Sequence, residues 1–290
     1  MKSPAPAGIS RAVLVTGCSS GIGAATAERL ARKGWTVYAT ARRPETLASL
    51  AAAGCRTLQL DVTDEASMSA AVAQVERDCG AVGVLVNNAG YGQDGAVEEV
   101  PLDLVRRQFE TNVFGLMRMC QLVLPGMRAQ RWGRIVNVGS MGGRLTFPGG
   151  GAYHATKHAV VAISDALRFE VAGFGVAVSL IEPGLILTRF GDTVIGSMDH
   201  AEANAEGPYA AFHDAVAKRT AAGYSGTMAK LAGAPPDAVA RVIERAISSR
   251  HPRARYPVTA GARMMLGLRA VLPDRAFDSV LRTQYPRPKP

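Results

Sequence analysis

Tyr153 and Lys157 lie four residues apart in the string Tyr-His-Ala-Thr-Lys. In a helix this spacing places both side chains on one face. A phenol with its ordinary pKa of about 10 is a poor proton donor or acceptor at neutral pH, but a neighbouring ammonium favours the phenolate and lowers that pKa. The pair therefore predicts a tyrosine that exchanges a proton with a substrate, although Tyr and Lys at this spacing also occur often on helix surfaces.

Ser140 is a third candidate for this chemistry. It lies just after the apolar run at residues 135–138, which reads Ile-Val-Asn-Val and is typical of a buried strand. Groups that follow the strands of a doubly wound sheet lie at its carboxyl edge, where such sheets bind ligands. We therefore expect Ser140 to join Tyr153 and Lys157 in one catalytic site.

A glycine-rich turn after the first apolar run indicates a phosphate site. Residues 16–23 read Thr-Gly-Cys-Ser-Ser-Gly-Ile-Gly, and a helical pattern follows directly. A helix N-terminus presents unpaired N–H groups and the positive end of its dipole, and glycines allow a phosphate to approach the backbone. The spacing differs from the Gly-x-Gly-x-x-Gly fingerprint, and a simple β-to-α turn is the alternative. The strand before it and the helix after it favour a pyrophosphate cradle.

The choice between NAD and NADP depends on the end of the next apolar run, residues 37–40. NAD-binding proteins keep an acid there for the adenosine ribose, about 20 residues beyond the glycines. Here the chain reads Ala41-Arg42-Arg43. Guanidinium groups suit a 2′-phosphate, which a carboxylate would repel. We therefore predict NADP(H) as the cofactor; the alternative is that the two arginines open a solvated helix.

The elements that must position these residues follow a regular alternation. Because the strand-like runs are apolar on both faces, as at residues 13–15 and 84–86, they predict a parallel sheet covered by helices on both sides. The fold class is therefore α/β, with a Rossmann-like, doubly wound parallel sheet. Strand-like runs cover residues 12–16, 36–40, 57–60, 82–86, 134–138 and 176–181, and helical patterns cover residues 24–33, 45–53, 64–79, 102–131 and 153–173.

The alternation changes after Pro183. Residues 191–233 hold scattered Gly, Ser, His and Asp with weak helical patches, which predicts a C-terminal substrate lid. The C-terminal helices and last strand are expected within residues 235–285, as a helix at 235–249, a strand at 255–258 and a helix at 262–272. The expected organisation is a disordered tail at residues 1–10 and a single Rossmann-fold domain at residues 11–290, with a disordered end at 285–290.

Composition and charge exclude several classes of protein. The chain has 290 residues, of which 48% are hydrophobic and 20% charged, so disordered, collagen-like and low-complexity chains are excluded. The net charge is +9, but the last fifty residues hold 11 basic and 3 acidic residues. We therefore expect no nucleic-acid partner for the body of the protein, and an electrostatic partner would meet the C-terminal segment.

The cysteines and the N-terminus bear on the compartment. Cys18, Cys55, Cys79 and Cys120 are widely spaced without a Cys-x-x-Cys pair, which predicts free thiols in a reducing compartment. The first residues lack the apolar run of a signal peptide, and no stretch of about 18 apolar residues predicts a transmembrane segment. A cytoplasmic protein is expected.

Taken together, the motifs resemble those of the short-chain dehydrogenase/reductase family. They are the glycine turn, Asn-Asn-Ala-Gly at residues 87–90, Ser140, Tyr153-x-x-x-Lys157 and Pro183-Gly184, in this order. The resemblance covers about residues 11–190. Strings such as Ser-Leu-Ile-Glu at residues 179–182 look like those of the 17β-hydroxysteroid and retinol dehydrogenase branch.

The resemblance implies hydride transfer between a nicotinamide ring and a carbonyl or alcohol. It implies that Tyr153 exchanges a proton with the substrate oxygen, that Lys157 binds the nicotinamide ribose, and that Ser140 hydrogen-bonds the substrate. Asn112 matches an asparagine that supports a proton relay through water. The cofactor-binding residues expected in all are Gly17, Ser19, Ser20, Gly21, Ile22, Gly23, Arg42, Arg43, Asp61, Val62, Asn88, Ala89, Gly90, Tyr153, Lys157, Pro183, Gly184, Ile186 and Thr188.

The expected function is NADP(H)-dependent oxidation or reduction of a small-molecule carbonyl or secondary alcohol. The alternative from another class is a non-catalytic NADP(H)-binding regulatory protein on the same fold, which would not need the acid/base residues. The resemblance also implies a homodimer or homotetramer formed through the helices at 102–131 and 153–173. An apolar substrate, such as a steroid, a retinoid or another ketone or aldehyde, is favoured by Leu145, Phe147, Leu185, Ile186 and Leu187.

Three further features have simpler interpretations. His154 and His158 have the spacing of a zinc pair, but no glutamate follows His154, so we expect a helix surface or a subunit interface and no metal site. Cys18 lies in the phosphate turn, where a thiol pKa can fall, and we interpret it as a packing residue. The helix expected at 262–272 has an apolar face that consists of Met264, Met265, Leu268, Val271 and Leu272. Such a face fits either packing on the domain or weak peripheral contact with an anionic membrane.

Overall fold

The computed structural model describes residues 8–188, 190, 207–224, 233–283 and 285. Within them, seven parallel strands form one sheet in the order β3-β2-β1-β4-β5-β6-β7. This is the Rossmann-like, doubly wound sheet that the apolar runs predict. The strands are β1 (Val13–Val15), β2 (Val37–Ala41), β3 (Arg56–Gln59), β4 (Val84–Asn87), β5 (Gly133–Val138), β6 (Val176–Glu182) and β7 (Arg255–Pro257).

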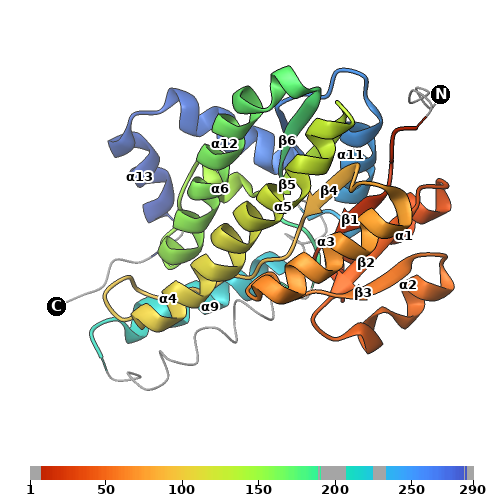
Figure 1. Ribbon diagram of the computed structural model, residues 1–290. Coiled ribbons are helices and arrows are strands. Elements are labelled where there is room, and N and C mark those ends of the chain that lie inside the picture. The colour runs from red at the N-terminus through yellow and green to blue at the C-terminus, as the bar shows by residue number, and fades with distance from the viewer. Residues whose placement is uncertain (1–7, 189, 191–206, 225–232, 284, 286–290) are drawn as a thin grey trace.

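Helices cover both faces of the sheet (Figure 1). α3, α5 and α6 pack on one face, and α1 and α11 pack together on the other. The α-helices are α1 (Gly21–Arg32), α2 (Ala48–Ala52), α3 (Glu65–Cys79), α4 (Leu102–Phe109), α5 (Leu116–Ala129), α6 (Gly151–Glu170), α9 (Ala210–Tyr224), α11 (Pro236–Ser248), α12 (Ala260–Val271) and α13 (Asp274–Arg282), and a π-helical segment (Glu110–Gly115) joins α4 to α5.

Alternation along the strands builds two apolar cores. In β1, Leu14 packs in the core under α3 and α5, whereas Val13 and Val15 pack in the core under α1 and α11. Successive side chains of a strand point to opposite faces, so a strand buried on both faces must be apolar throughout. The sequence of β1 meets this requirement, which explains why its run of apolar residues has no polar alternation.

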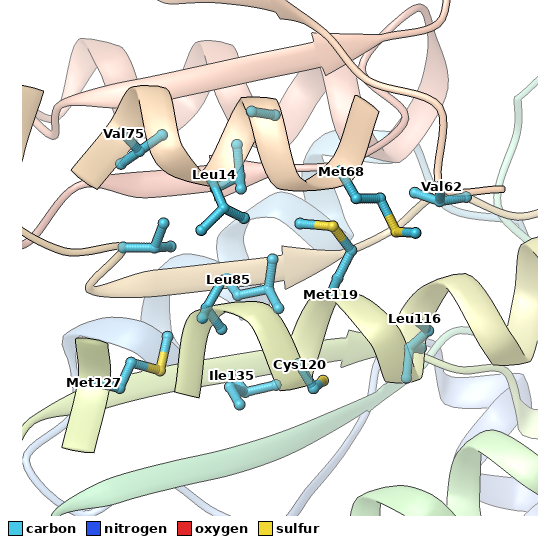
Figure 2. Packing of buried hydrophobic residues seen from close by; sticks show 14 of the residues in the cluster. Leu14, Val62, Met68, Val75, Leu85, Leu116, Met119, Cys120, Met127 and Ile135 are labelled. Carbon is cyan, nitrogen blue, oxygen red and sulfur yellow. The ribbon is translucent and has the colours of Figure 1, made fainter. Parts of the chain in front are cut away.

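Figure 2 shows the core under α3 and α5. Leu14, Leu85 and Ile135 come from neighbouring strands, and Met68 of α3 and Met119 of α5 lie over them. The unbranched methionine side chain adapts to irregular space between elements. This core fixes α5 and α3 on the sheet and thereby fixes the loops that leave their ends.

The chain reverses its direction across the sheet between β1 and β4. β1 continues to β2 on one side, while β4 continues to β5 on the other. The loops after β1 and β4 therefore diverge, and doubly wound sheets bind ligands in the crevice at such a point. Gly17, with φ +71°, follows β1, and a methyl group on it would lie 2.9 Å from the Cα atom of Ala89. The two loops start so close together that only glycine fits.

The helical region at 102–131 is present, but it is not one α-helix. α4 continues into the π-helical segment, and α5 then runs to Ala129. A π turn contains one residue more than an α turn, and helix propensity does not reveal where it occurs. The predicted helix at 45–53 is likewise divided into a 3₁₀ turn at Pro44–Leu47 and the short α2.

The described residues near both ends are more ordered than the sequence predicts. The backbone N–H of Ser10 donates to Oε1 of Gln130 at 3.0 Å, so Ser10 belongs to the fold and not to the disordered tail expected at 1–10. The backbone N–H of Tyr285 donates to the carbonyl oxygen of Leu281 at 3.0 Å. Residues 1–7 and 286–290 lie outside the described residues. So does much of the lid expected at 191–233, but α9 within it is a regular helix.

α12 packs through a face that differs from the predicted one. It buries Leu266, which the predicted face omits, and Met265 packs beside it, whereas Met264 and Val271 are 67% and 77% exposed. The predicted apolar face is thus divided between the core and the solvent, and membrane contact stays a prediction. In the part of the chain that the structure describes, no helix is both long and apolar enough to span a bilayer.

The last strand is fastened to the sheet by charged side chains. Glu182 at the end of β6 is fully buried, and its Oε1 atom accepts from Nη1 of Arg255 at 3.1 Å. Arg144 lies 3.8 Å from the same oxygen. Arg255 also binds Asp165 of α6. Arg255 therefore joins β7 to both β6 and α6.

Replacing Arg255 with Met should lower the free energy of unfolding by about 2 kcal/mol, because the buried carboxylate of Glu182 loses the cation that donates a hydrogen bond to it. The loss is smaller than for a fully buried pair because Arg255 is 28% exposed. Denaturant unfolding measures the change. Arg32→Met, which removes an exposed pair with Glu28, is the control and should cost less than about 0.5 kcal/mol. Equal losses in the two variants would contradict the role of Arg255.

Candidate active site

Thr16 ties the turn after β1 to the turn after β4. Its Oγ1 atom accepts hydrogen bonds from the backbone N–H groups of Asn88 and Ala89, both at 3.0 Å. In return, Nδ2 of Asn88 donates to the carbonyl oxygens of Thr16 at 2.9 Å and Gly17 at 3.0 Å. Asn88 and Gly17, both predicted cofactor residues, thus shape the glycine turn.

The glycine turn has the geometry of a pyrophosphate cradle. α1 begins at Gly21, so the free N–H groups and the positive dipole end of the helix lie at the turn. A methyl group on Gly23 would lie 2.5 Å from Nδ2 of Asn88 and closer still to the carbonyl oxygen of Gly17. Gly21 has φ +60°, and a methyl group there would lie 3.3 Å from Thr188. The turn therefore fits the diphosphate of a dinucleotide.

Cations line the cleft beyond the end of β2. Arg42 and Arg43 both line it, together with Arg107 of α4. Burial raises the pKa of Tyr91, whereas the charges of Arg107 and Arg42 act to lower it. The guanidinium groups of Arg42 and Arg107 are therefore close enough to the Tyr91 phenol to affect its pKa. This arrangement fits an anionic group near the adenosine ribose.

Three of the four predicted catalytic residues come together at the carboxyl end of β5 and the N-terminal end of α6. Nζ of Lys157 lies 5.8 Å from the centroid of the Tyr153 ring and donates to the carbonyl oxygen of Val138 at 3.1 Å. Ser140, two residues after β5, lies close enough to the hydroxyl of Tyr153 to lower the pKa of that phenol. Oγ of Ser140 also accepts from the N–H of Gly142 at 3.0 Å. A substrate oxygen placed between the two hydroxyls would meet both.

Burial decides the protonation of Tyr153. Removal of the phenol from water raises its pKa well above the ordinary value, and the hydrogen bond with Ser140 opposes this shift in part. The net shift of the Tyr153 pKa is therefore upward, opposite to the net lowering that the sequence predicts. Burial also lowers the pKa of Lys157 to about 8. Tyr153 therefore keeps its proton at neutral pH, which suits a proton donor.

Asn112 lies behind the catalytic residues, in the π-helical segment. Its Nδ2 atom donates to the carbonyl oxygen of Tyr91 at 2.9 Å and to Oγ1 of Thr156 at 3.1 Å. Its Oδ1 atom accepts from the N–H of Tyr91 at 3.1 Å. π-helical turns often occur at functional sites. Asn112 therefore connects the loop after β4 to Thr156 of α6, the residue before Lys157.

His154 is buried, which corrects its expected place on a helix surface or at a subunit interface. Its ring centroid lies 5.8 Å from that of Phe147 and 5.5 Å from that of Tyr153. Its Nδ1 atom lies 3.0 Å from the carbonyl oxygen of Gly142, and burial lowers its pKa to about 4. The neutral imidazole thus holds the turn after Ser140. Across the described ranges, no three His, Cys, Asp or Glu side chains gather as metal ligands would.

Cys18 is a packing residue, as the sequence indicates. Its Sγ atom lies 3.2 Å from the carbonyl oxygen of Val15, and burial raises its thiol pKa to about 12. A lowered pKa, which its place in the turn suggests, is therefore wrong. All four cysteines are free thiols.

A cleft of about 1300 Å³ runs along the carboxyl edge of the sheet and contains most of the predicted site. Gly23 and Asn112 support it from behind and do not line it. Of the apolar residues expected near the substrate, Leu145 is buried in the cluster around Leu266, and Leu187 also lies outside the lining. The predicted residues that line the cleft are Gly17, Ser19, Ser20, Gly21, Ile22, Arg42, Arg43, Asp61, Val62, Asn88, Ala89, Gly90, Ser140, Phe147, Tyr153, Lys157, Pro183, Gly184, Leu185, Ile186 and Thr188.

Several lining residues were not singled out from the sequence. Among them are Tyr91 and Asp94 after β4, Tyr224 at the end of α9, and Tyr285. α9 and Tyr285 meet the loop after β4 in a small apolar cluster of Ala96, Tyr209, Phe212, Val216, Ala217 and Tyr285. No periodic pattern marks these residues, because long-range packing brings them to the cleft.

Comparison with known proteins agrees with this geometry. A family model described as short chain dehydrogenase matches residues 11–196. The chain belongs to the short-chain dehydrogenase/reductase family. This short-chain dehydrogenase/reductase is therefore an oxidoreductase with a site for a nicotinamide cofactor. The finer resemblance to the 17β-hydroxysteroid and retinol dehydrogenase branch stays a prediction.

Relatives of this short-chain dehydrogenase/reductase match it over nearly their whole length. The uncharacterized oxidoreductase YbbO of Escherichia coli K12 is 35% identical over 274 residues, 94% of each chain. The NADPH-dependent 3-dehydrocapnine reductase of Ornithobacterium rhinotracheale is 34% identical over 280 residues, 93% of this chain and 95% of that one.

Solved structures of the family superimpose on the same fold. A short-chain dehydrogenase from Streptomyces avermitilis is 35% identical, with a TM-score of 0.74 over 95% of this chain and 99% of that one. A short chain dehydrogenase/reductase from Burkholderia phymatum, in complex with NAD, is 25% identical, with a TM-score of 0.75 over 99% of both chains.

Replacing Gly23 with Ala should weaken dinucleotide binding by roughly tenfold or more, because the methyl group pushes apart the backbone of the glycine turn and Asn88. Fluorescence titration with NADPH and NADH measures the Kd values. Gly173→Ala, at a position with nothing within 4 Å, is the matched control and should bind normally. Normal binding by the Gly23 variant would show that the turn is not the phosphate cradle.

Proposed function

We propose that this protein is an NADP(H)-dependent carbonyl reductase or alcohol dehydrogenase for apolar ketones, aldehydes or secondary alcohols. One observation carries the proposal. Ser140, Tyr153 and Lys157 meet in a cleft that continues without interruption to the glycine turn and Arg42. A carbonyl group and a dinucleotide would therefore be bound side by side.

The preference for NADP(H) rests on the arginines after β2. Arg42 and Arg43 line the cleft where the ribose of the cofactor would lie, and the chain has no acid at this turn. One relative is named as NADPH-dependent, and one structural neighbour was solved with NAD. The family thus uses both cofactors, so the choice depends on residues of this chain.

The chain's own groups supply the proton chemistry of a reduction. When bound, a nicotinamide cofactor supplies hydride at the carbonyl carbon. Tyr153 donates its phenolic proton to the carbonyl oxygen, so the product is an alcohol. Ser140 donates a hydrogen bond to the same oxygen and orients it. Lys157 stabilises the phenolate left on Tyr153, and Asn112 holds α6 in place.

Apolar side chains favour an apolar substrate. Phe147, Leu185 and Val216 line the cleft, and the Phe190 ring lies 5.4 Å from the Tyr153 ring. These residues contribute apolar surface to the cleft. The lid role proposed for 191–233 is supported by α9, which contributes Val216 to the lining.

The catalytic side chains bear on whether the protein is an enzyme or a non-catalytic NADP(H)-binding regulator. A non-catalytic binding protein has no use for Ser140, Tyr153 and Lys157 gathered in one cleft, so this arrangement favours an enzyme. We propose a homodimer or homotetramer in the cytoplasm. Its contacts would involve the exposed apolar side chains Phe114, Met117 and Phe169 on the helices expected to assemble.

Replacing Tyr153 with Phe should lower kcat for reduction of a ketone by roughly 10²- to 10⁴-fold, because it removes the proton donor. The Kd for NADPH should stay within about twofold, since the ring remains. NADPH absorbance and fluorescence titration provide the two measurements. Tyr209→Phe, which removes a phenol that bonds to Glu98 on the surface, is the control. Normal turnover by the Tyr153 variant would refute the assigned role.

Replacing Arg42 and Arg43 together with Ala should raise the Kd for NADPH by roughly ten- to a hundredfold and leave that for NADH unchanged. The reason is that charge-assisted bonds to a phosphate are lost. Arg32→Ala on the surface of α1 is the control for net charge. A parallel change for both cofactors would contradict a 2′-phosphate site.

A further inference from the structure

Gln108 places an amide group against the loop that follows β4. It is fully buried in α4, whose other residues are partly or fully exposed. Its Nε2 atom donates a hydrogen bond to the carbonyl oxygen of Tyr91 at 3.1 Å. The same oxygen accepts from Nδ2 of Asn112 at 2.9 Å. Because a carbonyl oxygen has two lone pairs, these two donors use its full capacity.

The Tyr91 peptide belongs to a chain of hydrogen bonds that ends at the backbone of the catalytic tyrosine. Oδ1 of Asn112 accepts from the N–H of Tyr91 at 3.1 Å, and Nδ2 of Asn112 also donates to Oγ1 of Thr156 at 3.1 Å. Oγ1 of Thr156 donates to the carbonyl oxygen of Tyr153 at 2.7 Å. Gln108 stands at the far end of this chain, so it acts on Tyr153 only through other residues.

The same loop lies next to the ammonium group of Lys157. A methyl group on Gly90 would lie 3.0 Å from Oδ1 of Asn112 and 3.7 Å from Nζ of Lys157. Gly90 and Tyr91 both line the cleft. A displacement of the Tyr91 peptide would therefore move the backbone that Asn112 and Lys157 face, and with it a wall of the cofactor cleft.

The bond to Tyr91 requires a donor at position 108. An N–H group bonds to the carbonyl oxygen of Tyr91, whereas an oxygen in its place would be repelled. Among the residues that the structure describes, the other amide atom of Gln108, Oε1, is buried without a hydrogen-bond partner. Methionine is of similar length but has no donor, and glutamate has a donor only while it is protonated. Substitutions of Gln108 can therefore separate the donor from the space that the side chain fills.

We propose that Gln108 is a positioning residue of the active site. Its N–H group fixes the Tyr91 peptide, and through this peptide it fixes the amide of Asn112 and the loop beside Lys157. Gln108 does not line the cleft, so it touches neither substrate nor dinucleotide. The effect on turnover rests on the proposed function, whereas the effect on dinucleotide binding does not require a reaction.

Gln108→Met should lower kcat for reduction of a ketone by roughly tenfold and raise the Kd for NADPH by roughly threefold, the order expected for loss of one buried hydrogen bond. The KM for the ketone should stay within about twofold, because Gln108 does not touch the substrate. Gln130→Met removes an amide that donates to the carbonyl oxygen of Trp132 at 2.8 Å. This control should leave kcat and Kd unchanged, since no bond of Gln130 leads to the cleft.

Gln108→Glu tests the donor itself. Burial raises the pKa of a carboxyl group above its ordinary value of about 4.3, so this glutamate is neutral at low pH and ionised at high pH. The neutral form donates to Tyr91 as the amide does, and the ionised form repels the carbonyl oxygen. Relative to wild type, kcat should therefore fall and the Kd for NADPH should rise as the pH rises. The same ratios for Gln108→Met should not change with pH.

Three results would overturn the inference. The first is a folded Gln108→Met variant, checked by circular dichroism, with the kcat and Kd of the wild type. The second is a Gln108→Glu variant whose ratios to wild type do not change with pH. The third is an equal loss of kcat in Gln130→Met. If Gln108→Glu does not fold, Gln108→Met decides, because it introduces no charge.

Failure of the inference and failure of the proposed function give different results. Turnover of ketones by the wild type and by both Gln108 variants at equal rates would remove the role of Gln108 and leave the reductase intact. A pH-dependent rise of the NADPH Kd in Gln108→Glu, without turnover of any ketone by the wild type, would leave the role of Gln108 and remove the reductase.

Discussion

The hydrogen bond from Nζ of Lys157 to the carbonyl oxygen of Val138 joins α6 to the end of β5, and the arrangement of the active site depends on it. An ammonium group is costly to bury without polar partners, so this contact determines where the helix can lie. Ser140 follows Val138 by two residues, and Tyr153 precedes Lys157 by one helical turn. One buried cation thus fixes the three catalytic side chains relative to one another.

The charges of the cleft are separated along its length. Arg42, Arg43 and Arg107 line the part near β2, whereas Asp94 acts on the phenols around Tyr153. An anionic dinucleotide is attracted to the region near β2. Electrostatics therefore favours one direction of binding before any specific contact forms.

The sheet and most of the site could be predicted because their signals are local. A few neighbouring residues are enough to predict a buried strand from the apolar run that contains Leu14. The same holds for Gly17, which lies in the turn between a strand and a helix. The Tyr153–Lys157 pair is local in the same sense. The protonation of Tyr153 is not local, because it depends on burial by elements far away in the sequence.

The features that the sequence did not reveal arise from long-range packing. His154 is buried because the turn that contains Gly142 folds over it, and no periodic pattern reports that contact. Asp94 follows a strand in a Gly- and Asp-containing turn, a composition typical of exposed loops. Only the approach of α9 and Tyr285 turns that loop into the wall of a cleft.

The π-helical segment has a consequence for how this molecule can change. It inserts one residue into an otherwise continuous helical rod, so α4 and α5 differ in rotational phase by about 100° from an uninterrupted helix. Loss of a single residue there would rotate every side chain of α4 about its axis while leaving α5 on the sheet. Asn112 would then leave Tyr91, and Arg107 would leave the cleft. The length of this segment is therefore as constrained as the identity of its residues.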